Sequence, residues 1–223
     1  MAKISRLKRI VWLALIAAAL FVPAGTLAWP GAWIFLLCFI GGMLLTMAWL
    51  KRHDPELFHE RVRRFRQSDQ PLWDQVLGLG IVVVWYGWLA AMGFEARGAG
   101  PTPVAALSAG AALIIVGYFL TAASLGANRF AVTAVRLQRE RRQSVMDKGP
   151  YAVVRHPMYA ASITIHLGTA LLLGAGWGFA GVVLLAFLLG LRAVLEEGLL
   201  CAGLPGYRDY TARVRWRLIP GLW

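Results

Sequence analysis

Long apolar stretches dominate this chain and leave few folds open to it. An α-helix needs roughly 20 apolar residues to cross the ~30 Å hydrocarbon layer of a bilayer. Four stretches of the chain come close to that length, and they cover residues 10–29, 32–50, 76–94 and 104–125. The first two are separated only by Pro30 and Gly31, which predicts a tight hairpin connection there.

A fifth apolar stretch covers residues 158–195 and is too long for one crossing, because a helix of that length would extend about 57 Å. The sequence LGAGWG, residues 173–178, is rich in glycine and predicts a reversal. The two arms are then 159–173 and 179–195. The fold class is therefore expected to be all-α, a polytopic membrane bundle of about six transmembrane helices whose last two form a hairpin.

The composition agrees with a membrane protein, since 59% of the residues are hydrophobic and 15% are charged. The formal net charge of +12 is compatible with nucleic-acid binding only until the charges are placed along the chain. Of the 23 Lys and Arg residues, all but Arg97 lie within 1–9, 51–75, 126–157 and 190–223. The positive-inside rule then puts both termini in the cytoplasm. We expect an inner-membrane protein with its polar face toward the cytoplasm.

The basic segments lack a recognisable nucleic-acid-binding module, so anionic lipid headgroups are the expected counter-ions. The sequence RLQRERR, residues 136–142, is typical of a basic strip facing lipid, with a lid as the second interpretation. Residues 51–75 mix both signs of charge with aromatic residues and predict an interfacial helix or elbow. His53 and His59 within this segment are not at metal-ligand spacing.

The sequence KGPYAVVRHPMY, residues 148–159, concentrates polar and ring-bearing side chains at the start of the fifth predicted helix. Pro157 biases His156 toward an extended conformation, so we expect the helix to begin here with its free N–H groups toward a polar ligand. An equal alternative is that Arg155 and His156 only mark the membrane interface.

A second polar cluster, formed by Arg192, Glu196 and Glu197, ends the sixth predicted helix. Arg192 and Glu196 are four residues apart and can pair on one helix face, whereas Glu197 points elsewhere. If the last two helices form a hairpin, both polar clusters lie at one end of it. Such a pocket suits an organic ligand with charges of both signs better than a metal.

The motifs GPYAVVRHPMY, RAVLEEGLL, LPGYRDY and RLIPGLW occur in this order within residues 125–223. In order and spacing they resemble the isoprenylcysteine carboxyl methyltransferase family, integral membrane enzymes that use S-adenosylmethionine. The RHP-x-Y element alone also resembles membrane sterol reductases and phospholipid N-methyltransferases. The resemblance implies one membrane domain over residues 1–223, with a four-helix scaffold over 1–125 and a cofactor-binding, catalytic portion over 126–223.

The resemblance also implies roles for individual residues. Arg192 and Glu196 would be catalytic, with Arg192 facing the substrate and Glu196 holding the amino group of the cofactor. The residues implied to bind the cofactor are Gln143, Ser144, Val145, Met146, Tyr151, His156, Pro157, Met158, Tyr159, Glu196 and Glu197. Gly206, Tyr207 and Tyr210 would fold the tail over the pocket. Two residues depart from the family: Ala161 stands where glycine is common, and Gln143 where histidine is common.

His166 shares a helix face with Tyr159 and is a second candidate for substrate binding, with a hydrogen-bonded structural role as the equal alternative. The family resemblance thus implies methyl transfer from S-adenosylmethionine to a lipophilic acceptor, first the carboxylate of a prenylated cysteine, without a metal. Alternatives are a phospholipid amine or a small thiol as acceptor, an NADPH-dependent reductase of the sterol type, and a non-catalytic scaffold or transporter. The chain has no dinucleotide-binding glycine fingerprint.

Overall fold

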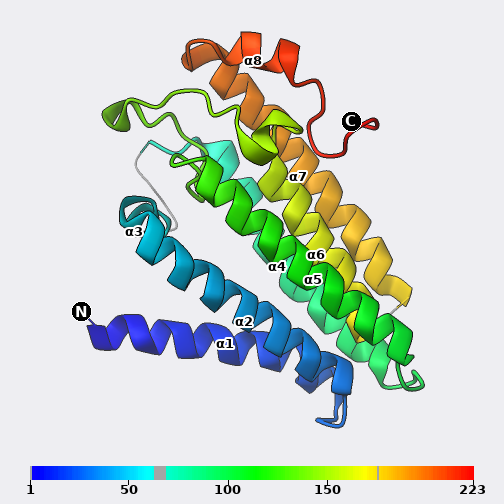
Figure 1. The fold of residues 1–223 in the computed structure, drawn as a ribbon. Coiled ribbons are helices and arrows are strands. Elements are labelled where there is room, and N and C mark those ends of the chain that lie inside the picture. The colour runs from blue at the N-terminus through cyan, green and yellow to red at the C-terminus, as the bar shows by residue number, and fades with distance from the viewer. Residues whose placement is uncertain (1, 63–68, 175) are drawn as a thin grey trace.

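The computed structural model describes residues 2–62, 69–174 and 176–223. Within these residues the secondary structure is helical, without a strand (Figure 1). The long helices are α1 (Ala2–Ala24), α2 (Pro30–His53), α4 (Leu72–Ala96), α5 (Val104–Ala127), α6 (Pro157–Leu173) and α7 (Gly176–Gly203). The short ones are α3 (Pro55–Val62), α8 (Tyr207–Arg213) and the 3-10 turns η1 (Arg139–Arg141) and η2 (Gly149–Ala152).

The apolar helices confirm the expected membrane bundle. Four of them, α2, α4, α5 and α7, are long and apolar enough to cross a bilayer, and Ile10–Ala24 and Pro157–Leu173 are shorter apolar helical stretches. Helices α4 to α7 lie side by side with their axes similarly inclined, whereas the axis of α1 crosses theirs at an angle (Figure 1). Many large apolar side chains, such as Leu37, Phe119 and Val183, are exposed on the outside of the bundle, as a lipid-facing surface requires.

The connection between α1 and α2 differs from the predicted tight turn at Pro30 and Gly31. Helix α1 ends at Ala24, because Gly25 follows in the left-handed conformation with φ of 68°. Pro30 is the first residue of α2 and Trp29 its N-cap, so Pro30 and Gly31 belong to the helix and not to the turn. The error arose because residues 25–29 are themselves mostly apolar, and a proline favours the first turn of a helix as well as a loop.

Helices α5 and α6 approach each other closely through small residues. A Cβ atom on Gly110 would lie 2.7 Å from the carbonyl oxygen of Gly168, and one on Gly168 would lie 2.6 Å from that of Gly110. About two turns further along α5, a Cβ on Gly117 would lie 2.9 Å from the carbonyl oxygen of Ala161. Small residues at these positions allow backbone-to-backbone packing, as is common between membrane helices. Ala161 is therefore fully buried at a helix contact.

The last two long helices reverse direction near Gly174, whose φ of 66° gives α6 a left-handed C-cap. Helix α7 has 28 residues, about 42 Å at 1.5 Å per residue, which exceeds the ~30 Å hydrocarbon layer. One end of the bundle carries α3, the segment 128–156 and the segment 204–223, and is called the basic end below (Figure 1). The start of α6 and the final turns of α7 meet there, as the predicted hairpin requires.

Candidate active site

A cavity of about 400 Å³ opens at the basic end, between α4, α6, α7 and the segment 128–151. Its polar part is lined by loop and tail residues that include Gln143, Tyr151, Tyr207 and Tyr210. Its apolar part lies along α4 and α7 and is lined by Gly78, Ile81, Val82 and Leu189. The cavity therefore joins a polar chamber to an apolar one, and its size is within the usual range for small-molecule sites.

Tyr159 and Glu196 meet at the centre of this cavity. The Tyr159 hydroxyl donates a hydrogen bond to Glu196 Oε2 over 2.6 Å. The guanidinium of Arg192 lies 5.7 Å from the centre of the Tyr159 ring, and the His156 ring stacks on it at 5.3 Å with an interplanar angle of 1°. Tyr159 thus contacts an acidic side chain through its hydroxyl and a basic one through its ring, a suitable arrangement for a ligand that carries both charges.

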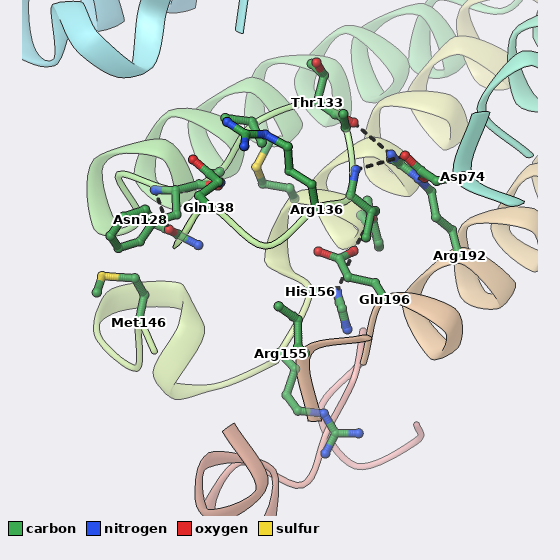
Figure 2. Close-up of a pocket in the computed structure, with 18 of the residues that line it drawn as sticks. Asp74, Asn128, Thr133, Arg136, Gln138, Met146, Arg155, His156, Arg192 and Glu196 are labelled. Atoms are coloured by element: carbon green, nitrogen blue, oxygen red, sulfur yellow. Dashed lines mark hydrogen bonds and ion pairs between the residues drawn. The ribbon is translucent and has the colours of Figure 1, made fainter. Parts of the chain in front are cut away.

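Arg192 does not pair with Glu196, although their spacing on one helix permits it. Its Nε donates instead to Asp74 Oδ1 on α4 over 2.7 Å, and its Nη2 donates to the carbonyl oxygen of Thr133 over 2.8 Å (Figure 2). Glu196 is left to accept from Tyr159. The expected pair is wrong because a partner on another helix holds Arg192 more firmly than the weaker arginine-before-glutamate order along one helix can.

Asp74 is fully buried, and both of its carboxylate oxygens are occupied. Oδ2 accepts from Gln70 Nε2 at 2.7 Å and from the backbone N–H of Val135 at 2.9 Å, while Oδ1 accepts from Arg192. These three donors satisfy the hydrogen bonding of a carboxylate that has no access to water. Asp74 therefore fixes the direction of Arg192 and is not placed to act as a base.

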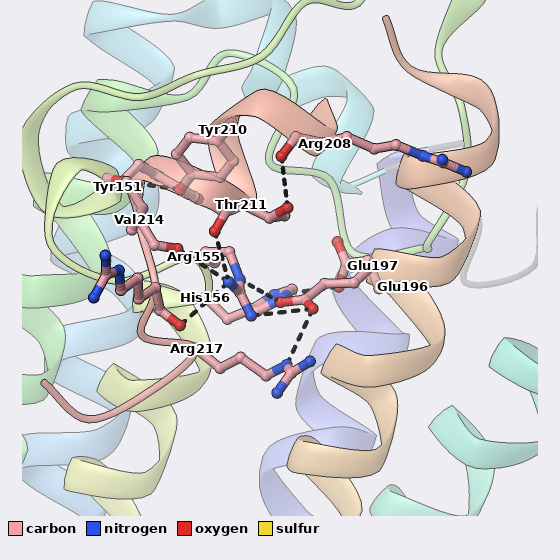
Figure 3. A network of polar contacts seen from close by, with 11 residues as sticks. Tyr151, Arg155, His156, Glu196, Glu197, Arg208, Tyr210, Thr211, Val214 and Arg217 are labelled. Carbon is pink, nitrogen blue, oxygen red and sulfur yellow. Dashed lines mark hydrogen bonds and ion pairs between the residues drawn. The ribbon is translucent and has the colours of Figure 1, made fainter. Parts of the chain in front are cut away.

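Glu197 faces the other way, into a polar network behind the cavity (Figure 3). Its Oε1 accepts from Arg155 Nε at 2.7 Å and from His156 Nε2 at 3.1 Å, and its Oε2 accepts from Arg217 Nε at 3.0 Å. Because an ionised carboxylate only accepts, the proton lies on Nε2 of His156. This network fixes the orientation of the imidazole ring that stacks on Tyr159.

The C-terminal segment closes this network through its backbone. The N–H groups of Arg155 and His156 donate to the carbonyl oxygens of Trp216 and Arg217, each over 2.9 Å. Arg155 Nη1 also donates to the carbonyl oxygen of Val214 at 3.0 Å. These contacts place His156 as the N-cap of α6 with Pro157 at its first position, as the sequence predicted.

Tyr151 and Tyr210 join the polar chamber to the tail. The Tyr210 hydroxyl donates to the carbonyl oxygen of Tyr151 over 2.8 Å, and both side chains are buried. Burial raises the pKa of Tyr151 to about 12; the hydrogen bond with Asn128 opposes this increase, the charge of Glu196 adds to it, and the charge of Arg61 opposes it slightly. Burial raises the pKa of Tyr207 and of Tyr210 as well, so all three phenols are neutral near pH 7.

Most residues that the resemblance singled out lie around this one cavity. The lining includes Gln143, Ser144, Val145, Met146, Tyr151, His156, Met158, Tyr159, Arg192 and Glu196. Pro157, Glu197 and His166 are not among the lining residues. His166 is buried beside Trp88, with ring centres 5.4 Å apart, so the structure places it at a helix contact.

The two departures from the family fall in different places. Gln143 lines the cavity, and its Oε1 accepts from the backbone N–H of Gln138 at 2.7 Å. Ala161 lies outside the lining, at the contact with α5. Only Gln143 can therefore change the shape of the pocket directly.

Several lining residues were missed by the sequence interpretation: Arg61, Gln70, Asp74, Asn128, Thr133, Arg136 and Gln138. Asp74 had one usable signal, an acidic residue at the start of an apolar stretch. One residue of the basic strip differs from its prediction, because Arg136 is buried and donates to Asp69 at 2.8 Å and to Glu140 at 2.7 Å. Among the described residues, no group of three or more His, Cys, Asp or Glu side chains is arranged to hold a metal ion.

Comparison with known families agrees with this geometry. The phospholipid methyltransferase family model matches residues 105–201, from α5 to the end of α7. Residues 105–201 are therefore similar to a family of membrane methyltransferases. The family consists of integral membrane enzymes related to the isoprenylcysteine carboxyl methyltransferases, so the resemblance noted in the sequence is confirmed. None of the curated proteins matches the chain.

Proposed function

We propose that this chain transfers a methyl group from S-adenosylmethionine to a lipophilic acceptor, and that the acceptor group is a carboxylate such as that of a prenylated cysteine. The observation that supports it best is the cavity itself, in which a polar chamber with charges of both signs continues into an apolar chamber between α4 and α7. A polar cofactor and a lipid-like acceptor can meet there without either leaving its preferred surroundings.

The residues of the polar chamber fit the cofactor. Glu196 uses Oε2 for Tyr159 and can accept from the cofactor's ammonium group through Oε1. The stacked rings of His156 and Tyr159 provide flat surfaces against which a sulfonium cation is stabilised. When bound, S-adenosylmethionine supplies an electrophilic methyl group on a positively charged sulfur.

Arg192 is the residue proposed to orient the acceptor. Asp74 and the carbonyl oxygen of Thr133 hold its Nε and Nη2, and within the described residues Nη1 makes no hydrogen bond. A carboxylate that accepts from Nη1 sits beside the Tyr159 ring, at the junction of the two chambers. In the transfer, a carboxylate oxygen forms a bond to the methyl carbon as the bond from that carbon to sulfur breaks, giving a methyl ester and S-adenosylhomocysteine.

No proton has to move in this reaction, because the acceptor is already anionic. Opposite charges on sulfur and oxygen are neutralised together, so exclusion of water from the junction favours the transition state. The protein's contribution is then mainly positioning. An amine acceptor would need a proton acceptor, and Asp74 cannot serve because its oxygens are fully hydrogen-bonded.

The first experiment is calorimetric titration of the purified protein in detergent with S-adenosylhomocysteine, beside NADPH. We expect binding of S-adenosylhomocysteine and its loss in Glu196→Gln. Asp209→Asn is the matched control, since Asp209 is an exposed acid on α8 outside the cavity. Binding of NADPH alone would instead indicate a reductase, and binding of neither would support a non-catalytic scaffold.

The acceptor is tested separately with methyl-labelled cofactor. A farnesylated cysteine derivative and phosphatidylethanolamine are each incubated with the same protein preparation. Labelled methyl that base releases from the product identifies a methyl ester, since an N-methyl group resists base. Label that enters only the phospholipid amine would overturn the carboxylate assignment and keep the methyltransferase assignment. A thiol acceptor is checked in the same way with a lipophilic thiol.

A further inference from the structure

Arg61, on α3, brings a cation to the wall of the cavity from outside the stretch that matches the methyltransferase family. It lies at the basic end, where α3 packs beside the segment that follows α5. Its Nη1 donates to the carbonyl oxygen of Ala131, which also lines the cavity. Burial lowers the pKa of the guanidinium from its ordinary value. An arginine retains its charge even so.

No described carboxylate pairs with Arg61. The acids nearest to it on α3 are engaged by other arginines: Glu56 by Arg129 and Arg141, and Glu60 by Arg136. Residues 63–68, outside the described part of the chain, contain no Asp or Glu in their sequence. Within the described part of the chain, Arg61 therefore has a carbonyl oxygen as a partner but no counter-charge.

Arg61 is partly buried, and a guanidinium that is partly removed from water without an anion is at a disadvantage, so such a group is normally paired. The other arginines of the cavity wall follow this rule, since Arg136, Arg155 and Arg192 each contact a carboxylate within 2.8 Å. Arg61 is the exception among these four. An anionic group on a ligand in the cavity would provide the missing partner.

The surroundings of Arg61 indicate which part of a ligand it reaches. Arg61 and Glu196 both act electrostatically on the Tyr151 phenol, with opposite effects on its pKa. Arg61, Glu196 and Tyr151 all line the cavity, so charges of opposite sign share its wall with Tyr151. Asn128 and Met146 line the same chamber and carry no charge. A ligand with an ammonium group near Glu196 can thus place an attached carboxylate toward Arg61.

We propose that Arg61 is an anion-binding residue of this cavity, and that it takes the oxygens of a carboxylate or phosphate group on the bound ligand. The carboxylate on the amino-acid part of S-adenosylmethionine is the source favoured by the position of Glu196, and this choice rests on the proposed function. The phosphate of a lipid in the cavity has the same chemistry and is the second source.

The test compares two nucleosides that differ in the amino-acid part. S-adenosylhomocysteine carries the carboxylate, whereas 5′-methylthioadenosine retains the adenosine and the thioether and lacks it. In Arg61→Gln we expect the dissociation constant of S-adenosylhomocysteine to rise about 10-fold to 100-fold, the usual effect of a lost charge-assisted hydrogen bond. The dissociation constant of 5′-methylthioadenosine should change less than about twofold.

Two further variants guard against a change in fold. Arg129→Gln removes an exposed arginine that contacts Glu56 and should leave both dissociation constants unchanged. Arg61→Lys keeps the charge and should retain part of the affinity for S-adenosylhomocysteine. The thermal unfolding temperature of Arg61→Gln should not fall below that of the wild type, because the change removes a partly buried charge that no described carboxylate balances.

A short-chain phosphatidic acid, with the matching diacylglycerol as control, distinguishes the phosphate source. If Arg61→Gln weakens the binding of phosphatidic acid and leaves the binding of S-adenosylhomocysteine unchanged, the anion is a lipid phosphate. If it weakens neither, Arg61 does not bind an anion and the inference is wrong. If wild-type protein fails to bind S-adenosylhomocysteine, the proposed function fails, while the phosphatidic acid measurement still decides the role of Arg61.

Discussion

Arg192 on α7 and Asp74 on α4 form an ion pair of 2.7 Å between Nε and Oδ1 at the junction of the two chambers of the cavity. The pair joins the two helices that border the apolar chamber, and the Asp74 side chain is fully buried. Since Asp74 also receives the N–H of Val135, one carboxylate connects α4, α7 and the loop beyond α5. The orientation of Arg192 therefore depends on a residue outside the segment that matches the family.

Asp74→Asn should reduce methyl transfer more than cofactor binding. The amide can accept from only one side, so Arg192 keeps a weaker and less directed contact. We expect kcat/KM for the acceptor to fall at least about 10-fold, and the dissociation constant of S-adenosylhomocysteine to change less than about threefold. Breaking a buried pair also costs about 3 kcal/mol of stability, which thermal unfolding in detergent will show.

The control for this variant is Asp69→Asn, because Asp69 pairs with Arg136 at 2.8 Å but is half exposed. We expect a change in stability below about 1 kcal/mol there. Equal losses of acceptor transfer in Asp69→Asn and Asp74→Asn would show that Asp74 has no special part in positioning Arg192.

Arg217→Gln should weaken cofactor binding although Arg217 lies behind the cavity. Its Nε donates to Glu197 Oε2 at 3.0 Å, and Glu197 in turn holds His156, whose ring stacks on Tyr159. Loss of this donor should raise the dissociation constant of S-adenosylhomocysteine about fivefold through a looser imidazole. Calorimetry measures the affinity, and the chemical shifts of ¹⁵N-labelled His156 report its orientation.

A comparison with Arg213→Gln makes the Arg217 measurement specific. Arg213 carries the same charge on the same tail but pairs with Asp147 at an exposed position. If both variants lose the same affinity, the effect is due to the net charge of the tail, and the positioning role of Arg217 is refuted.

The helices were largely predictable because a bilayer crossing leaves a direct mark on the sequence, a length of apolar residues without charges. The start of α6 was predictable for a local reason, since Pro157 restricts the residue before it. The end of α1 was not, because residues 25–29 continue the apolar stretch and only the left-handed Gly25 ends the helix.

The residues of the candidate site could be predicted where they belong to a sequence motif. They could not be predicted where they are distant in the sequence and meet only in the folded structure. Tyr159, His156 and Glu196 stand in recognisable motifs, and the hairpin of α6 and α7 brings them together. Asp74 is 118 residues from Arg192 along the chain, and no periodicity in the sequence relates the two. In the sequence, Arg61 is one of several arginines of a basic interfacial segment. Only the structure distinguishes it, because no described carboxylate pairs with it.

Alkaline pH should destabilise the protein partly through Tyr151. Its pKa is raised to about 12 in the folded state and is about 10 when unfolded. The neutral phenol is therefore favoured by folding, and its contribution is fully present below pH 10 and lost as the pH rises through 12. The difference of about two units corresponds to roughly 3 kcal/mol.

Thermal unfolding of wild type and Tyr151→Phe between pH 9 and pH 12 measures this contribution. We expect the variant to lose less stability than the wild type over this range, because phenylalanine has no proton to release. Other buried tyrosines titrate in both proteins and cancel in the comparison. Parallel stability curves would show that the Tyr151 phenol is not held neutral by the fold.

Gly168→Val should disrupt the bundle through the contact between α5 and α6. A Cβ atom at Gly168 would lie 2.6 Å from the Gly110 carbonyl oxygen and 2.9 Å from Ile114 Cγ1, so the backbones must separate. Overpacking of this kind costs about 1 to 3 kcal/mol, and the rigid backbone contact here puts the expected loss near 3 kcal/mol. The matched control for Gly168→Val is Gly80→Ala on α4, because no atom lies within 4 Å of the added Cβ.

Alanine at position 80 should stabilise the helix by about 0.5 to 1 kcal/mol, because glycine is less favourable than alanine inside a helix. Thermal unfolding in detergent that ranks the two variants in the opposite order would show that α5 and α6 do not pack in this way.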